Sequence, residues 1–190
     1  MAPSAPLRAL LAALAAAAAR AGYNGFGEHG EMNVAWSVDT ANITMRLTCR
    51  SPNVTNPSYD LAYCAFGINT NNVSSSSMVP AYVWWLGVST GGAALAVEDR
   101  VISSFAQPPC AATQMTRTIE ASYDAASGTL SALFTRALSA GGAAGYADIV
   151  AAPLQVLGAV GGKGRAAGSC AMSASEHFFD AHNVAIDFLA

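Results

Sequence analysis

Charged side chains are scarce in this sequence. Asp, Glu, Lys and Arg make up 11% of its 190 residues, whereas they make up about a quarter of an average soluble protein. The nine Lys and Arg residues form no cluster, and the formal net charge is −3. Because nucleic-acid-binding domains carry a basic patch or stripe, this pattern excludes DNA and RNA as expected partners.

Apolar runs long enough to cross a membrane are also missing, since a spanning helix needs about 20 residues. The apolar run at residues 10–19 is too short, but it lies between Arg8 and the small-residue site Ala19-Arg20-Ala21. This arrangement predicts a secretory signal peptide at residues 1–21. A transit peptide is the alternative, because the segment contains Arg and no acidic residue. The C-terminus carries no hydrophobic tail for a lipid anchor. We therefore expect residues 22–190 to form one soluble, secreted domain without a transmembrane segment.

The cysteines form no Cys-x-x-Cys pair and no Cys-x-x-Cys-His motif, so the sequence predicts neither a zinc site nor covalent c-type haem. Four cysteines are present, and they allow three disulfide pairings. Local spacing favours Cys49 with Cys64 and Cys110 with Cys170. Asn-x-Ser/Thr sequons begin at Asn42, Asn53 and Asn72, which is consistent with an exported glycoprotein.

Short strands separated by turns account for the rest of the chain. Residues 43–49 alternate apolar and polar side chains, as a half-buried strand does. Further strands are expected at residues 32–38, 61–68, 79–88, 94–97, 101–105, 114–123, 129–137, 154–160 and 183–188. A Gly-, Ser- and Ala-rich loop is expected at residues 161–175. About nine short strands at this spacing predict an all-β fold, an antiparallel immunoglobulin-like β-sandwich.

An ordered set of motifs carries a family resemblance over residues 31–188. The set comprises Trp36, Tyr63-x-x-Phe66-Gly67-Ile68, Met78-x-x-Ala81-Tyr82-Val83-x-Trp85, Glu98-Asp99, Phe134-x-Arg136-x-Leu138, Pro153-Leu154-Gln155-Val156-Leu157, and a histidine before Val184-x-Ile186-Asp187-Phe188. In this order the motifs resemble a DOMON domain, the module found in dopamine β-monooxygenase relatives and in the cytochrome domain of cellobiose dehydrogenase. One departure is Ala81-Tyr82, where many relatives have Ala-Asp.

The resemblance implies a b-type haem held by one methionine and one histidine. Met78 matches the family's methionine position. His177, expected in a loop before the last strand, matches the histidine position best, with His182 as the alternative. Tyr82 and Trp84 are expected on the same side of their strand as Met78, unless Pro80 introduces a bulge, and are predicted to contact the haem. Met78 as a gap-filling core residue and His177 as a solvated loop residue are the alternatives.

Methionine and histidine would fill both axial positions of the iron, which favours electron transfer over oxygenation. Methionine raises the potential relative to a second histidine. We therefore expect a secreted b-type haem electron carrier rather than a catalyst, with a redox protein or an ascorbate-like reductant as partner. The alternative is a haem-free DOMON module that binds a sugar or a protein. A chain that continues into a larger redox protein is a further possibility.

Overall fold

The computed structural model describes residues 21–26, 32–56, 60–70, 80–103, 110, 111, 113–162, 170 and 176–190, and only the backbone of 21–26 and 176–183. These residues form ten strands and no helix. The strands are β1 (Ala21–Phe26), β2 (Met32–Val38), β3 (Asn42–Arg50), β4 (Leu61–Asn69), β5 (Ala81–Gly87), β6 (Glu98–Ile102), β7 (Arg117–Asp124), β8 (Thr129–Ala137), β9 (Leu154–Gly162) and β10 (Glu176–Ile186).

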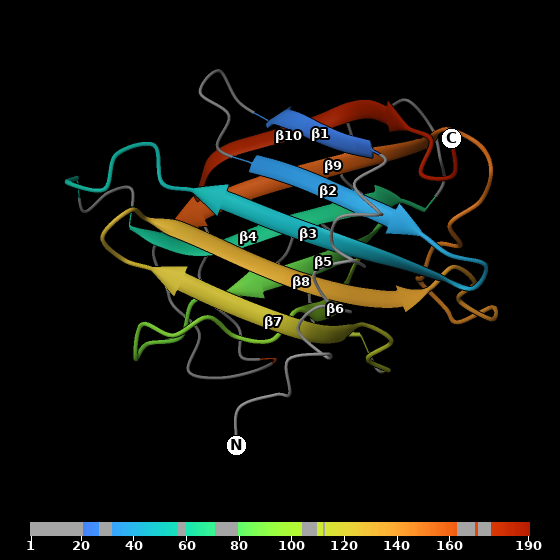
Figure 1. Cartoon of the computed structure of the whole chain (residues 1–190), viewed down its shortest axis with the longest axis horizontal. Helices are drawn as coiled ribbons and strands as arrows, with labels where there is room; N and C mark the ends of the chain where they lie inside the picture. The colour runs from blue at the N-terminus through green and yellow to red at the C-terminus, as the bar shows by residue number, and fades with distance from the viewer. Residues whose placement is uncertain are drawn as a thin grey trace, which may run out of the picture.

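The strands pair into two five-stranded sheets that lie face to face (Figure 1). Sheet A has the order β1-β2-β3-β8-β7, and sheet B has the order β10-β9-β4-β5-β6. Every pairing between these strands is antiparallel. The predicted antiparallel β-sandwich is therefore confirmed.

Sheet A has one buried face and one more open face, as its sequence alternation requires. In β3 the side chains of Ile43, Met45, Leu47 and Cys49 are buried, while the residues between them are exposed or partly exposed. Strands β2 and β8 repeat the pattern. Because alternate residues of a strand point to opposite faces, these apolar rows meet sheet B and form the main core.

Strands β4, β5 and β9 of sheet B are buried on both faces. Their inner rows, which include Phe66, Trp84 and Val156, join the main core. Their outer rows form a second apolar group, here called the outer cluster. It consists of Ala62, Tyr63, Ala65, Ala81, Val83, Trp85, Leu157 and Ala159.

Both favoured disulfides are present. Cys49 on β3 and Cys64 on β4 link the two sheets through the core, and each is 0% exposed. Cys110 and Cys170 link two segments that lie 60 residues apart in the sequence.

Strand β1 was not predicted, and three strand predictions differ from the structure. Residues 94–97 contribute only an isolated bridge between Val88 and Ala94. The strand expected at residues 101–105 begins earlier, as β6, because its charged residues are buried, with Glu98 and Arg100 in an ion pair, and do not form a turn. The last strand begins at Glu176 instead of residue 183, so His177 lies within a strand and not in a loop. Two register irregularities in β10 disturb the alternation by which a strand is recognised.

The predicted signal peptide lies outside the described residues except for Ala21, which begins β1. Of the sequons, Asn42 begins β3 and Asn53 is exposed in the turn that follows it. The Asn53 side chain accepts hydrogen bonds from the backbone and hydroxyl of Thr55. Asn72 lies outside the described residues, and glycosylation stays a prediction.

Candidate functional site

The outer cluster forms an apolar platform on the face of sheet B that points away from sheet A. Four of its eight members are alanine, and each member is 5% exposed or less. Across β9, β4 and β5 the platform is about 10 Å wide, because neighbouring strands lie roughly 4.8 Å apart. The segments that connect these strands, residues 71–79 and 163–175, lie outside the described residues apart from Cys170.

An aromatic stack borders this platform towards β6. The rings of Tyr63 and Trp85 are parallel, with their centroids 4.1 Å apart. The Arg100 guanidinium lies 4.5 Å from the centre of the Trp85 ring. Arg100 is 2% exposed and its Nη2 is 2.7 Å from a carboxylate oxygen of Glu98. A buried ion pair therefore covers one edge of the apolar platform.

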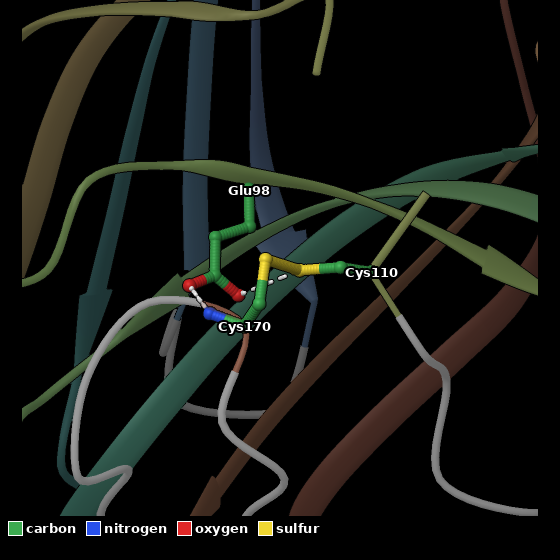
Figure 2. Close-up of side chains that lie close together, drawn as sticks. All are labelled: Glu98, Cys110 and Cys170. Carbon is green, nitrogen blue, oxygen red and sulfur yellow. Dashed lines mark hydrogen bonds between the residues drawn. A yellow bond between two sulfur atoms is a disulfide. The ribbon is translucent and has the colours of Figure 1, made fainter. Parts of the chain in front are cut away.

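Glu98 also contacts the second disulfide (Figure 2). The backbone N–H of Cys170 donates to Glu98 Oε1 over 2.5 Å, and Cys110 Sγ lies 3.6 Å from Glu98 Oε2. A carboxylate and two cysteines could in principle hold a metal ion. Their sulfurs are joined to each other here, however, and metal ligation by cysteine requires a thiolate. The group is therefore a disulfide seated on a buried ion pair.

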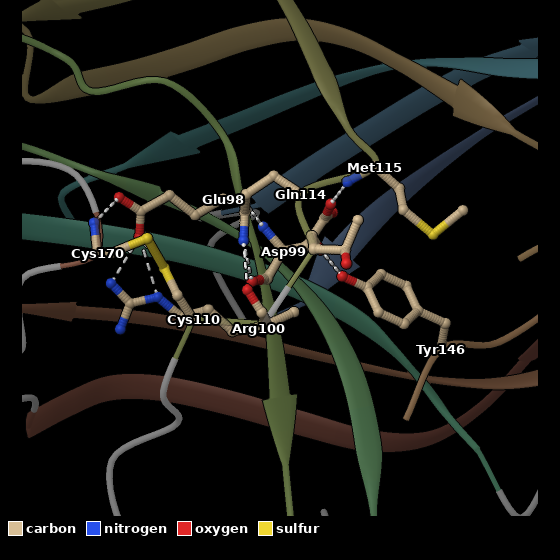
Figure 3. The surroundings of a disulfide bond; sticks show 10 residues. Glu98, Asp99, Arg100, Cys110, Gln114, Met115, Tyr146 and Cys170 are labelled. Carbon is tan, nitrogen blue, oxygen red and sulfur yellow. Dashed lines mark hydrogen bonds and ion pairs between the residues drawn. A yellow bond between two sulfur atoms is a disulfide. The ribbon is translucent and has the colours of Figure 1, made fainter. Parts of the chain in front are cut away.

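A different polar network lies on the opposite side of β6, between the sheets (Figure 3). Asp99 is 0% exposed, and its carboxylate accepts hydrogen bonds from the Tyr82 hydroxyl, from the Thr116 hydroxyl and from the backbone N–H groups of Met115 and Thr116. Gln114 holds the backbone of Asp99 through both its amide atoms. Asp99 is thus fixed by four donors.

Tyr82 connects this network to a buried cation. The Arg136 guanidinium lies 4.9 Å from the Tyr82 ring centre, and it donates to the backbone carbonyls of Ala137 and Ala147. Burial, followed by the nearby charge of Asp99, raises the pKa of the Tyr82 hydroxyl far above its ordinary value of 10.0. The phenol therefore remains a proton donor to Asp99 throughout the physiological range.

The predicted site residues lie in different parts of this structure. Tyr82 and Trp84 are on the inner face of β5, within the main core and not on the platform. Met78 is outside the described residues, three positions before Ala81. His177 and His182 belong to β10, where only the backbone is described. Their contacts with a haem stay predictions.

In the sequence, Glu98, Asp99 and Arg136 stand out only as members of the ordered motifs, and Arg100 lies outside them. The available signal was four charged residues within a chain that has few. Three of them, Glu98, Asp99 and Arg100, are consecutive between apolar residues, and charged residues are almost never fully buried unless they are paired. That signal marks both networks beside β6.

Comparison with known proteins supports the fold. No protein-family model matches the chain, and no curated protein sequence matches it. Among solved structures, the chain resembles the cytochrome b domain of pyranose dehydrogenase from Coprinopsis cinerea. The TM-score is 0.54 and the sequence identity is 10%, over 84% of this chain and 78% of that chain. At this identity the likeness concerns the fold alone. No helix suited to spanning a membrane occurs in the described part of the chain.

Proposed function

We propose that this chain is a secreted DOMON-type domain that binds a b-type haem and transfers single electrons. The observation that carries the proposal is the outer cluster, a buried apolar group on the outer face of sheet B in which four of eight members are alanine. Such a surface suits one face of a planar macrocycle. The structural likeness to a cytochrome b domain and the ordered DOMON motifs support the same interpretation.

The chain also offers a suitable pair of axial ligands. Met78 precedes β5, whose first residue, Ala81, belongs to the platform. Strand β10, next to β9 in sheet B, carries His177 and His182. A thioether and an imidazole leave no open position on the iron, so the haem would supply one-electron redox chemistry and no oxygen activation.

Strand register bears on the choice between the two histidines. His177 pairs with Gly161, which pairs with Tyr63, and Tyr63 pairs with Gly87. Gly87 lies six positions after Ala81, or about 20 Å along the strand, and β10 is three strands from β5, or about 14 Å across the sheet. In a flat sheet His177 is therefore about 25 Å from Ala81.

His182 lies much closer to the beginning of β5. It falls between Ala181, which pairs with Gly158, and Val184, which pairs with Val156. Across β4, these two positions of β9 are in register with Trp84 and Tyr82 of β5. His182 is therefore about 15–17 Å from Ala81. Three residues span at most about 10 Å, and Met78 therefore reaches the level of His182 more readily than that of His177. We favour Met78 and His182 as the ligands and retain His177 as the alternative.

The rest of the proposal concerns the compartment and the partner. Two disulfides and the N-terminal signal pattern support export to an oxidising compartment. The partner is a redox protein or an ascorbate-like reductant, because the proposed iron site has no place for a substrate. The domain thus acts as an electron carrier and not as a catalyst.

Absorbance spectra of the purified protein in the oxidised and reduced states test this function. We expect a Soret band and a sharp α-band in the reduced state. His182→Ala should abolish the low-spin spectrum, and Met78→Leu should weaken haem retention or make the iron five-coordinate. His29→Ala is the matched control and should leave the spectrum unchanged. Loss of the low-spin signal in His177→Ala, with a normal His182→Ala spectrum, would reverse the ligand choice. Colourless protein after haem supplementation would refute the haem proposal.

One observation favours the haem-free alternative, a sugar-binding module. A half-open cavity of about 250 Å³ lies at one end of the sandwich, and Asn56, Asp60 and Tyr123 are among its lining residues. An aromatic ring beside amide and carboxylate groups suits a polyhydroxylated ligand. This alternative predicts that monosaccharides shift the amide NMR signals of these residues, and that Tyr123→Ala removes the shifts. Unchanged spectra at millimolar sugar would eliminate it.

A further inference from the structure

The two disulfides differ sharply in their access to solvent. Cys49 and Cys64 are both 0% exposed in the core between the sheets. Cys110 is partly exposed and Cys170 is exposed. Thiol–disulfide exchange begins when an external thiolate attacks a disulfide sulfur, so its rate depends on access to that sulfur. Only the second bridge offers such access.

The accessible disulfide lies next to the Glu98 carboxylate, which can accept a hydrogen bond from a cysteine thiol. Cys110 Sγ lies 3.6 Å from Glu98 Oε2, and Glu98 is held in place by its ion pair with Arg100. If the disulfide is reduced, the Cys110 thiol can donate a hydrogen bond to Glu98 where its sulfur already lies. The reduced state therefore has a polar partner in place.

The backbone conformation of Cys170 also favours opening of the disulfide. Its φ of 58° lies in the left-handed region, and Cys170 is the only non-glycine with positive φ in the described part of the chain. Residues other than glycine adopt this conformation at a cost, which the surrounding structure must offset. The link to Cys110 and the hydrogen bond to Glu98 are the two described contacts that hold it.

We propose that Cys110–Cys170 is a thiol–disulfide exchange site for a dithiol reductant, either a small molecule or a thioredoxin-type protein. One reductant thiolate attacks a sulfur of the bridge, forms a mixed disulfide and expels the other cysteine as a thiolate, which takes up a proton. The second reductant thiol then displaces the bound cysteine. Two cysteine thiols and one oxidised reductant result, so electrons and protons balance.

Opening this bridge removes a covalent link to the chain shortly before β10. Cys110 is joined to β6 by a backbone bridge with Arg100, and Cys170 lies six positions before Glu176, where β10 begins. Strand β10 carries both candidate haem ligands. The consequence for haem rests on the proposed function: reduction at Cys110–Cys170 loosens the histidine-bearing strand and speeds haem loss.

Differential alkylation of the native protein tests the exchange site without reference to haem. The protein is treated with dithiothreitol, alkylated under native conditions and analysed by peptide mass spectrometry. We expect at least tenfold faster labelling of Cys110 and Cys170 than of Cys49 and Cys64. The buried pair is the internal control. Equal rates for the two pairs, or no labelling of Cys110 and Cys170 in folded protein, would overturn the proposal.

Haem transfer to apomyoglobin tests the coupling. The double variant Cys110→Ser/Cys170→Ser imitates the open state without any reductant, and we expect it to lose haem at least tenfold faster than the wild type. Retention as strong as in the wild type would overturn the coupling. Absence of haem from both proteins would instead refute the proposed function, while the labelling result would still decide the exchange site.

Discussion

Replacing Asp99 by Asn should destabilise the protein clearly less than replacing it by Ala. In Asp99, Oδ2 accepts from two backbone N–H groups, those of Met115 and Thr116, which cannot reverse their polarity. Oδ1 accepts from the hydroxyls of Tyr82 and Thr116, which can rotate and accept instead. The Asn amide should therefore turn its oxygen towards the backbone donors and its nitrogen towards the hydroxyls.

The expected magnitudes follow from this count of contacts. Asn keeps four hydrogen bonds but makes them neutral, and a charged partner adds roughly 0.5–1 kcal/mol to each. Relief of the buried charge offsets part of the loss, so we expect Asp99→Asn to cost about 2 kcal/mol. Asp99→Ala removes the acceptor altogether and should cost about 4 kcal/mol, within the range for breaking a buried charged network. These costs correspond to roughly 4–8 °C and 8–16 °C in Tm for a chain of this size.

Urea unfolding followed by tryptophan fluorescence measures both costs, because Trp84 packs directly against Tyr82 with ring centroids 5.0 Å apart. Tyr82→Phe in each background completes a double-mutant cycle for the contact between Tyr82 and Asp99. If the Asn and Ala variants lose equal stability, the proposed amide orientation is wrong. A loss below about 0.5 kcal/mol for Asp99→Ala would show that the buried network contributes little.

Three further outcomes follow from single features of the structure. Gly67→Ala should cost about 2–3 kcal/mol in urea unfolding, because its Cβ would lie 2.5 Å from the Tyr82 carbonyl oxygen; Gly91→Ala, which has room, is the control and should cost under 1 kcal/mol. The raised pKa of Tyr82 implies stability that is fully present below pH 10 and declines as pH rises above it, so alkaline unfolding should lose this slope in Tyr82→Phe. Backbone hydrogen bonds from Ala41 and then Asn42 lower the pKa of the exposed Asp39 carboxyl below 3.8, and an NMR titration midpoint at or above 3.8 would contradict this.

Alternation made much of the fold predictable from the sequence. In β2, β3 and β8 one face meets the core and the other meets solvent, so buried and open positions follow a period of two. Local spacing also sufficed for both disulfides. The strands that were placed poorly, β6 and β10, are those in which charged pairs or register irregularities replace that period.

The candidate site was less predictable than the fold. The alternation of side chains along a strand shows which residues share a face of β5. It does not show which face meets the other sheet, because both faces of β5 are apolar. Tyr82 and Trp84 lie in the main core, and their contact with a haem stays a prediction. Glu98 and Arg100 are two positions apart on the same strand, but Cys170 is 72 residues from Glu98, and no local pattern records that contact.

The strand order also has a consequence for how the chain acquires its structure during synthesis. The central partners in each sheet are distant in sequence: β3 pairs with β8, where Thr44 faces Thr135, and β4 pairs with β9, where Ile68 faces Val156. When the ribosome has completed β6, strands β8 and β9 have not yet been synthesised. One edge of β3 and one edge of β4 therefore still lack their pairing strand. Such non-local pairing slows folding. The nascent chain therefore stays open until almost its full length has been synthesised, and an export channel that admits only unfolded chains would find it in that state.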